Sequence, residues 1–242
     1  MSLNKNSNLY VFLFSAGVTA IVGIALAVAA TSLKERQEKN IALEKKGAIL
    51  SAVGFTGEKS EIETAYNQYI TPKAVSPQGK AVEGVDPFEL VPEDQQKLAQ
   101  KNPEEAKLPL YVFEREDDKC YIIPLYGKGL WGPIWGYVAI EKDLKTVRGV
   151  TFDHKSETPG LGAEITTEWF QEQFANKKIR DQKQFTSVEV LKGTGNNLNE
   201  HSVDGISGAT ITAKGVDKML REDIQLYMPY FKKAQDLKLS QL

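Results

Sequence analysis

The most constraining feature of the chain is an uncharged stretch close to its N-terminus. Between Lys5 and Lys34 no residue carries a charge, and the part from Leu9 to Ala30 is almost wholly apolar. An α-helix needs about 20 such residues to cross the hydrocarbon core of a lipid bilayer. We therefore expect a single membrane-spanning helix over residues 9–33, after a short N-terminal segment of residues 1–8. The remainder of the 242-residue chain is long enough for one sizeable globular domain.

The Ala27-Val28-Ala29 triplet gives this stretch a second interpretation, as a cleaved signal peptide. The apolar core of a signal peptide is typically about 7–15 residues long, and this stretch is longer, which favours a permanent span. Charge leaves the orientation of the span open. Most of the nearby basic residues follow it, which would keep the domain in the cytoplasm, but acidic residues are interleaved with them. Long domains also cross membranes largely regardless of charge.

The rest of the chain divides by its pattern of apolar residues. Residues 34–60 are charged and then apolar at helical spacing, which predicts a juxtamembrane helix. Residues 61–109 are rich in proline, lysine and acids, so we expect an irregular excursion with one short helix near Glu93–Gln100. Residues 110–232 form the main domain, and residues 233–242 a C-terminal tail.

Within the main domain, strand-like runs come first and helical patterns follow. The strands are expected at residues 110–114, 121–126, 135–141, 146–153 and 187–192, and the helices at residues 164–176 and 212–228. Strands followed by helices that pack on one side of them make the fold class α+β. The formal net charge of −2 gives no indication of nucleic-acid binding, and the single cysteine excludes an intramolecular disulfide.

The stretch DGISGATIT, Asp204 to Thr212, places two glycines and three hydroxyl groups just ahead of the last helical pattern. It resembles the nucleophile elbow of serine hydrolases, but both histidines of the chain precede Ser207, so the order of a catalytic triad fails. The GxxxxGK[ST] pattern of nucleoside-triphosphate loops is also missing. Two explanations remain open: a turn at a helix start that holds a phosphate, or an ordinary helix cap at Thr212.

Two further stretches combine glycines with apolar side chains. HKSETPGLGAEI, His154 to Ile165, predicts a tight turn in which Leu161 can lie against a flat ring, although an ordinary strand–helix loop has the same composition. GKGLWGPIWGYV, Gly127 to Val138, predicts an aromatic loop between two strands. Such a loop is usually a packed hairpin, but it can also line a ring-binding pocket or press against a neighbouring protein.

Taken in order behind one membrane span, these three stretches resemble the NqrC proteins of the Na+-translocating NADH:quinone reductase (Nqr) complexes. The related RnfG proteins of the Rnf complexes share the TPGLG and SGAT elements, whereas GLWGPIWG and LGAE favour Nqr. The resemblance implies an FMN-binding domain with an antiparallel-rich sheet and flanking helices. It also implies that FMN is joined by a phosphoester bond to Thr210, and that a separate flavin transferase attaches it from FAD with the help of a divalent metal ion.

The resemblance gives roles to residues around Thr210. Asp204 and Gly205 would serve recognition by the flavin transferase, and Lys214 would add a counter-charge for the phosphate, whose position near the helix start is worth about 0.3–1 kcal/mol. The other expected contacts of the cofactor are Ser207, Gly208, Ala209, Thr212, Thr158, Leu161, Gly162, Leu130 and Trp131. We expect neither a catalytic residue nor a metal or sodium site in this chain.

The same resemblance implies the partners and the location of the protein. Single electrons would pass from an iron centre in the membrane subunits of Nqr, through this FMN, to the FMN of NqrB and so toward ubiquinone. The chain would cross the bacterial inner membrane once, with its domain on the periplasmic side, against the count of basic residues. The alternatives are an Rnf-type flavin subunit of a ferredoxin:NAD oxidoreductase, and an anchored scaffold in which the SGAT turn is only a helix cap.

Overall fold

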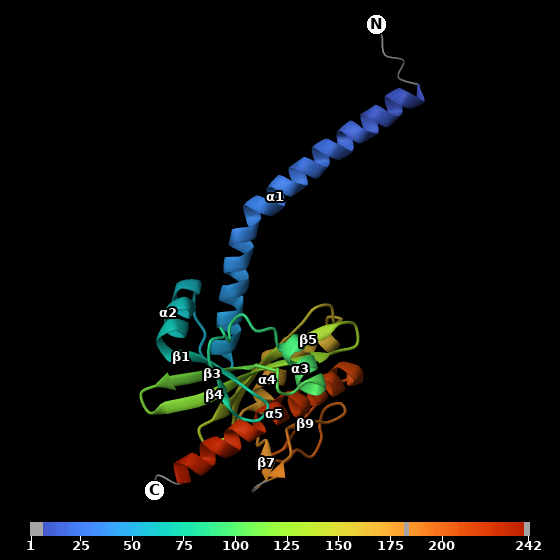
Figure 1. Ribbon diagram of the computed structural model, residues 1–242. Helices are drawn as coiled ribbons and strands as arrows, with labels where there is room; N and C mark the ends of the chain where they lie inside the picture. The colour runs from blue at the N-terminus through green and yellow to red at the C-terminus, as the bar shows by residue number, and fades with distance from the viewer. Residues whose placement is uncertain (1–6, 182–183, 240–242) are drawn as a thin grey trace. The chain divides into compact units, whose positions relative to one another are not determined.

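The computed structural model describes residues 7–181 and 184–239 (Figure 1). Most of the expected N-terminal segment 1–8, and the last three residues of the expected tail, lie outside the described residues. By its internal contacts the chain divides into two compact units, residues 1–45 and residues 46–242. Each unit is described by itself below.

Most of the first unit is helix α1 (Asn8–Ser51), which runs on into the second unit. Among the described residues it is the one helix long and apolar enough to cross a membrane, and the apolar side chains of residues 11–33 are exposed. The expected span and the first part of the expected juxtamembrane helix therefore form one continuous helix. It ends because Gly54 adopts a left-handed conformation, with a φ of 83°, which terminates helices.

The second unit is built on a six-stranded antiparallel sheet, which confirms the α+β class. The strand order is β2-β1-β3-β4-β5-β6, and every neighbouring pair is antiparallel. The strands are β1 (Ile70–Val75), β2 (Ala81–Val82), β3 (Leu108–Arg115), β4 (Asp118–Lys128), β5 (Pro133–Glu141) and β6 (Val147–His154). Strands β3 to β6 match the four expected strands with shifted ends.

The segment expected to be irregular contains more structure than its composition indicates. It holds most of helix α2 (Lys59–Tyr69), strands β1 and β2, and helix α3 (Pro92–Lys101), of which only α3 was expected. Strand β1 pairs with β3 along its whole length, although it contains Pro72. The proline is tolerated because β2 pairs only with Ala74 and Val75, so Pro72 lies where β1 is an edge strand.

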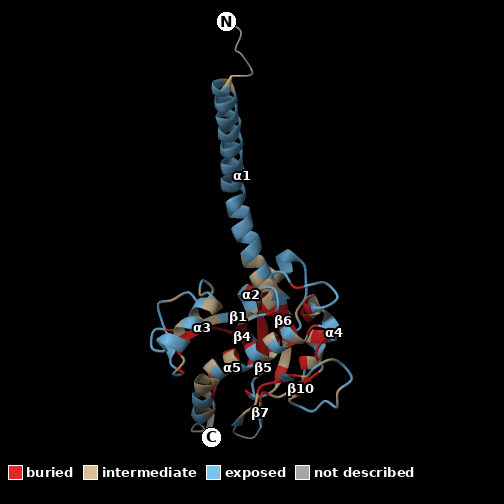
Figure 2. Cartoon of the chain, turned by 90° about the vertical axis from the view of Figure 1, so that its right-hand side faces the viewer, coloured by how far each residue is buried: buried red, intermediate tan, exposed pale blue. Residues whose placement is uncertain are grey.

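Each face of the sheet is covered by helices (Figures 1 and 2). On one face, helix α5 (Thr210–Leu239) buries the stripe that its sequence predicts, Val216, Met219, Leu220, Ile224 and Tyr227. The other face packs against Ile49 and Leu50 at the end of α1 and against α2. Residues of β4 alternate between the two cores, as the two-residue period of a strand requires.

The helix expected over residues 164–176 is broken into three short pieces, η1 (Gly162–Thr166), α4 (Glu168–Gln171) and η2 (Glu172–Phe174). The break falls at Thr167, whose backbone is extended and whose hydroxyl donates to the carbonyl of Glu164 at 2.6 Å. The strand expected over residues 187–192 is also shorter, because Ser187 has a φ of 65°. It is reduced to β9 (Glu189–Val190), which pairs with β10 (Ser202–Val203); β7 (Arg180–Asp181) pairs with β8 (Gln184–Phe185).

Helix α5 is held by close backbone contacts at two places along its length. Near its start, Gly215 lies so close to the carbonyl of Lys128 that a Cβ atom at this position would overlap the oxygen. Near its end, a Cβ atom on Gly79 would come within 2.5 Å of the Pro229 carbonyl carbon. The helix continues through Pro229, where the sequence predicts its end, since Phe231 beyond it is still fully buried in the core.

Candidate functional site

The three stretches singled out in the sequence meet at the N-terminus of α5. They are the loop between β4 and β5, the loop between β6 and η1, and the turn that leads from β10 into α5. His154, the last residue of β6, pairs with Ile134 near the start of β5, so the loop before β5 and the loop after β6 leave the sheet at the same end. Hydrogen bonds to Glu157 join the start of α5 to both loops.

A buried carboxylate, that of Glu157, joins the three loops. One of its oxygens, Oε2, accepts a hydrogen bond of 2.6 Å from the hydroxyl of Thr212 in α5. The other, Oε1, accepts one of 2.8 Å from the backbone N–H of Trp131 in the aromatic loop. The backbone N–H of Glu157 donates to Nδ1 of His154 at 3.1 Å, so the residue is also fixed on its own loop. Glu157 is 5 % exposed.

Two glycines of these stretches make room for that carboxylate. A Cβ atom on Gly129 would come within 2.5 Å of Oε1 of Glu157, and a Cβ atom on Gly162 would overlap Oε2. Glu157 is a residue of this site that the sequence analysis did not single out, because a glutamate in a polar loop is normally exposed to solvent. The available signal was its place inside the stretch His154–Ile165, close to Gly162, which leaves space for it.

The SGAT turn lies directly against the TPGLG turn. Gly208 has a φ of 79°, a conformation that side chains rarely adopt, and a Cβ atom there would come within 2.8 Å of Cδ2 of Leu161. The N–H of Ala209 closes the turn by donating to the carbonyl of Ile206 at 3.1 Å. Thr210 is therefore the first residue of α5 and is half-buried next to this contact.

Four large apolar side chains near Thr210 are exposed to solvent. Leu130 is 45 % exposed, Trp131 66 %, Leu161 40 % and Ile211 58 %. They come from all three stretches, and we call them the apolar rim. A cluster of exposed apolar side chains on a globular domain indicates a binding surface, since such side chains are otherwise mostly buried.

The start of the turn is fixed to its surroundings by Asp204 and Gly205. The Asp204 carboxylate accepts hydrogen bonds from the N–H groups of Gly195 and Asn196, at 2.9 and 3.0 Å, and from Nδ2 of Asn196 at 2.7 Å. Those hydrogen bonds, led by the ones from Asn196, hold the pKa of Asp204 below its usual value. Gly205 has no room for a side chain, because a Cβ atom would overlap the carbonyl of Leu191.

The remaining expected site residues are either exposed or buried. The exposed ones are Ser207 and Lys214, which are close to Thr210 in the sequence, and Thr158, which begins the TPGLG turn. Within the SGAT turn, Ala209 is buried. Thr212 and Gly162 instead face Glu157. In the described part of the chain, no group of three or more His, Cys, Asp or Glu side chains is arranged to hold a metal ion.

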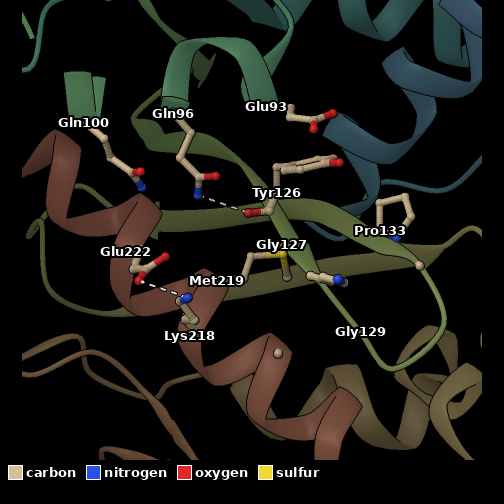
Figure 3. A pocket seen from close by; sticks show the side chains of 13 residues that line it. Glu93, Gln96, Gln100, Tyr126, Gly127, Gly129, Pro133, Lys218, Met219 and Glu222 are labelled. Carbon is tan, nitrogen blue, oxygen red and sulfur yellow. Dashed lines mark hydrogen bonds and ion pairs between the residues drawn. The ribbon is translucent and has the colours of Figure 1, made fainter. Parts of the chain in front are cut away.

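A pocket of about 560 Å³ lies beside the aromatic loop, between the end of β4, helix α3 and helix α5 (Figure 3). Gln96 of α3 points into it and donates through Nε2 to the carbonyl of Tyr126 at 3.2 Å and to Oδ1 of Asp223 at 2.7 Å. On α5, Lys218 and Glu222 face each other at 3.7 Å. The pocket borders the loop glycines but does not include Thr210.

The chain is similar in sequence to known proteins over most of its length. Residues 129–225, which contain nearly all of the three stretches, match the FMN-binding domain family. The NqrC protein of Vibrio parahaemolyticus, named for the Na(+)-translocating NADH-quinone reductase, is 32 % identical over 219 residues, covering 83 % of this chain and 84 % of the relative. The Haemophilus ducreyi protein of the same name is 33 % identical over 218 residues, with 84 % of each chain covered.

A solved structure gives the same result for the fold and the sequence together. The crystal structure of the NqrC protein from Parabacteroides distasonis superposes with a TM-score of 0.74 at 38 % identity, over 82 % of this chain and 96 % of that chain. The expectation drawn from the three stretches is thus confirmed at the level of the family. The chain belongs to the NqrC family of the Na+-translocating NADH-quinone reductases, and it is an FMN-binding subunit of an oxidoreductase complex.

Proposed function

We propose that the chain carries FMN in a phosphoester bond to Thr210 and relays single electrons toward quinone within the complex. The observation that supports this most directly is the position of Thr210. It is the first residue of the long helix α5, it is half-buried, and it lies next to the exposed apolar rim. No other hydroxyl in the DGISGATIT stretch combines these properties, since Ser207 lies outside α5 and Thr212 is buried and bonded to Glu157.

The surroundings of Thr210 fit both ends of FMN. The first N–H groups of an α-helix have no partner within the helix and point toward an anion at its start, which suits a phosphate. Lys214, one turn further on and exposed, supplies a counter-charge. The side chains that offer apolar surface to the ring system are Leu161, Leu130 and Trp131, and Thr158 lies at the edge of that surface. The turn that leads into Thr210 consists of Ser207, Gly208 and Ala209. Bound FMN supplies the capacity to accept and donate single electrons.

We expect attachment to require a separate enzyme, because no hydrogen bond joins the Thr210 hydroxyl to a carboxylate or an imidazole among the described residues. The buried carboxylate of the site, that of Glu157, is occupied by Thr212 and by Trp131. In the proposed reaction the Thr210 oxygen attacks the FMN phosphorus of FAD, the P–O–P bond breaks, AMP leaves, and the hydroxyl proton passes to the transferase. Asp204 and Gly205 hold the turn in the shape that the flavin transferase recognises.

Membership of the family supports a proposal for the anchor and the partners. We place residues 9–33 of α1 in the bacterial inner membrane and the FMN-binding domain on the periplasmic side. Electrons arrive from an iron centre in the membrane subunits and leave toward the FMN of NqrB. The exposed apolar rim suits this role, because an electron carrier has to bring its cofactor close to both partners.

The intact mass of the chain tests the attachment. Coexpression with a flavin transferase should add the mass of one FMN minus water to the wild-type chain and to Thr210→Ser, but not to Thr210→Val. Ser207→Ala is the matched control, since it removes an exposed hydroxyl from the same turn and should leave the added mass unchanged. An unmodified wild-type chain would refute the proposal. Quinone reduction by an assembled complex that contains Thr210→Val would assign SGAT to a helix cap and refute the electron relay.

A further inference from the structure

We propose that Glu157 is the positioning residue of the flavin site. Its buried carboxylate ties the aromatic loop and the start of α5 to the TPGLG turn, and so fixes the arrangement of the side chains that face the cofactor. The inference rests on the proposed function for the identity of the cofactor. The geometry of the three loops, however, stands without it.

The carboxylate of Glu157 is buried without a charged partner in its hydrogen bonds. A carboxylate that is 5 % exposed carries a large desolvation cost unless both of its oxygens are hydrogen-bonded. Here the two donors are a threonine hydroxyl and a backbone N–H, neither of which carries a charge. A buried glutamate bound only by uncharged donors is therefore an energetically costly way to stabilise an ordinary loop. Its burial is explained if the site needs the loop geometry that its two hydrogen bonds impose.

The two oxygens of Glu157 hold different elements of the site. Oε1 holds the backbone of Trp131 and Oε2 holds Thr212, two residues beyond the attachment point, so the carboxylate sets the distance between the aromatic loop and α5. Leu161, on the same loop as Glu157, lies against Gly208 of the SGAT turn. Every member of the apolar rim is therefore within a few residues of a contact made by this loop.

The space around the carboxylate is closely filled. Gly129 and Gly162 enclose it so tightly that a methyl group on either would strike an oxygen of Glu157. These glycines belong to two of the three stretches that define the site in the sequence. They leave room for the carboxylate, and the hydrogen bonds from Trp131 and Thr212 fix its position.

Hydrogen exchange of the Trp131 amide in the flavin-free full-length chain, in detergent, tests the first link. Trp131 has an exposed side chain, so its N–H is protected chiefly by Glu157. We expect Glu157→Ala to speed its exchange about tenfold or more, the effect of losing a hydrogen bond to a charged group. In Glu157→Gln the amide oxygen can still accept this bond, so exchange should stay close to the wild-type rate. Glu164→Ala is the control, because the Glu164 carboxylate accepts a hydrogen bond from the N–H of Gly160 in its own loop, whereas the N–H of Trp131 donates to Glu157. Exchange of the Trp131 amide should therefore be unchanged in Glu164→Ala.

The same variants, after attachment of FMN, test the second link. We expect the visible circular dichroism of the flavin to weaken in Glu157→Ala and to be restored in Glu157→Gln, since the signal depends on a fixed ring environment. Intact mass reports separately whether FMN is attached, so absence of the cofactor would refute the proposed function and leave the exchange experiment valid. Unchanged dichroism in fully flavinylated Glu157→Ala would overturn the inference.

A double-mutant cycle keeps the inference testable if Glu157→Ala alone destabilises the fold. Gly162→Ala places a methyl group against Oε2 of Glu157 and should destabilise the wild-type chain. In a Glu157→Ala background the oxygen Oε2 is removed, whereas Oγ1 of Thr212, 2.7 Å from the added methyl group, and the Cβ of residue 157, at 3.1 Å, remain. The same substitution should therefore cost less but still destabilise the protein. Equal costs in both backgrounds would show that Gly162 and Glu157 are not coupled, and the inference would fail.

Discussion

Asp223 illustrates how much the behaviour of a single residue depends on its surroundings. It lies in α5 and is 4 % exposed, with Oδ2 accepting from the N–H of Tyr126 at 2.7 Å and Oδ1 accepting from Gln96. Burial raises the pKa of this carboxyl to about 7, against the lowering effect of both hydrogen bonds. The group joins α3, β4 and α5 beside the pocket of Figure 3.

The raised pKa predicts that the protein loses stability as the pH rises. In the unfolded chain an aspartate loses its proton near pH 4, whereas the folded protein keeps the proton until about pH 7. Folding therefore favours the protonated form, and this contribution is complete below about pH 4 and disappears as the pH rises through 7. Between those limits we expect a decline on the order of 1–3 kcal/mol.

Urea unfolding of the full chain at several pH values measures this decline. Asp223→Asn removes the titration but keeps an acceptor for Tyr126, so its free energy of unfolding should change less between about pH 4 and about pH 7. Asp236→Asn, which changes an exposed aspartate of the same helix that is not among the groups acting on Asp223, should leave the decline intact. Identical pH profiles for the wild type and Asp223→Asn would contradict the assignment.

At this scale the sequence predicts residues that belong to a recognisable motif. A hydroxyl at a helix start is often only a cap, so Thr210 is identified by the resemblance of SGAT to a flavin-attachment motif. Glu157 does not stand out, because its importance lies in burial and in partners that are 26 and 55 residues away along the chain. Those contacts form only after the sheet has brought the loops together.

At the scale of elements, α5 is the part of the molecule on which the site depends. Gly215 sits against the carbonyl of Lys128 at the end of β4, and no side chain fits between the two backbones. In a solvent-exposed helix, glycine to alanine is normally stabilising by about 0.5–1 kcal/mol. Here we expect the opposite sign.

Gly215→Ala should lower the free energy of unfolding by about 1–3 kcal/mol, the usual cost of overpacking. Thermal unfolding followed by circular dichroism measures the change, with Lys218→Ala as the control because Lys218 is an exposed residue of the same helix. A more stable Gly215→Ala protein would show that α5 can move away from β4 without cost.

Element boundaries can be predicted where one signal dominates and are missed where two compete. The four strands β3 to β6 and the buried stripe of α5 follow from apolar periodicity. Proline misled the assignment twice: β1, which contains Pro72, lies in a segment expected to be irregular, and α5 continues through Pro229 beyond its expected end. Pro72 is tolerated where β1 is an edge strand, and beyond Pro229 the burial of Phe231 favours continuation of the helix; neither has a local signature in the sequence.

At the scale of the whole molecule, the two cores on either side of the sheet are connected through its central strands. Cys120 of β4 is fully buried in the core that also contains the end of α1, and burial raises the pKa of its thiol to about 12. A thiol with such a pKa is almost entirely protonated at neutral pH, and the thiolate is the reactive form.

We therefore expect Cys120 to resist alkylation by iodoacetamide until the domain unfolds. The fraction labelled should rise with urea along the same curve as the loss of circular dichroism, because β4 lies in the interior of the sheet. Mass spectrometry measures the labelling, and Cys120→Ser supplies the unlabelled control. Rapid labelling in the absence of urea would mean that this core opens separately from the rest of the domain.

The two backbone contacts of α5 also determine the position of Thr210, the residue proposed to carry the cofactor. In an α-helix, a slip of one residue moves each side chain about 1.5 Å along the axis and turns it by about 100°. Such a slip would turn Thr210 away from the apolar rim. Gly215 and, near the opposite end of the helix, the contact of Gly79 with Pro229 both forbid it. The position of Thr210 thus depends partly on the contact between Gly79 and Pro229, about five helical turns further along α5. That contact lies outside the sequence motif for flavin attachment.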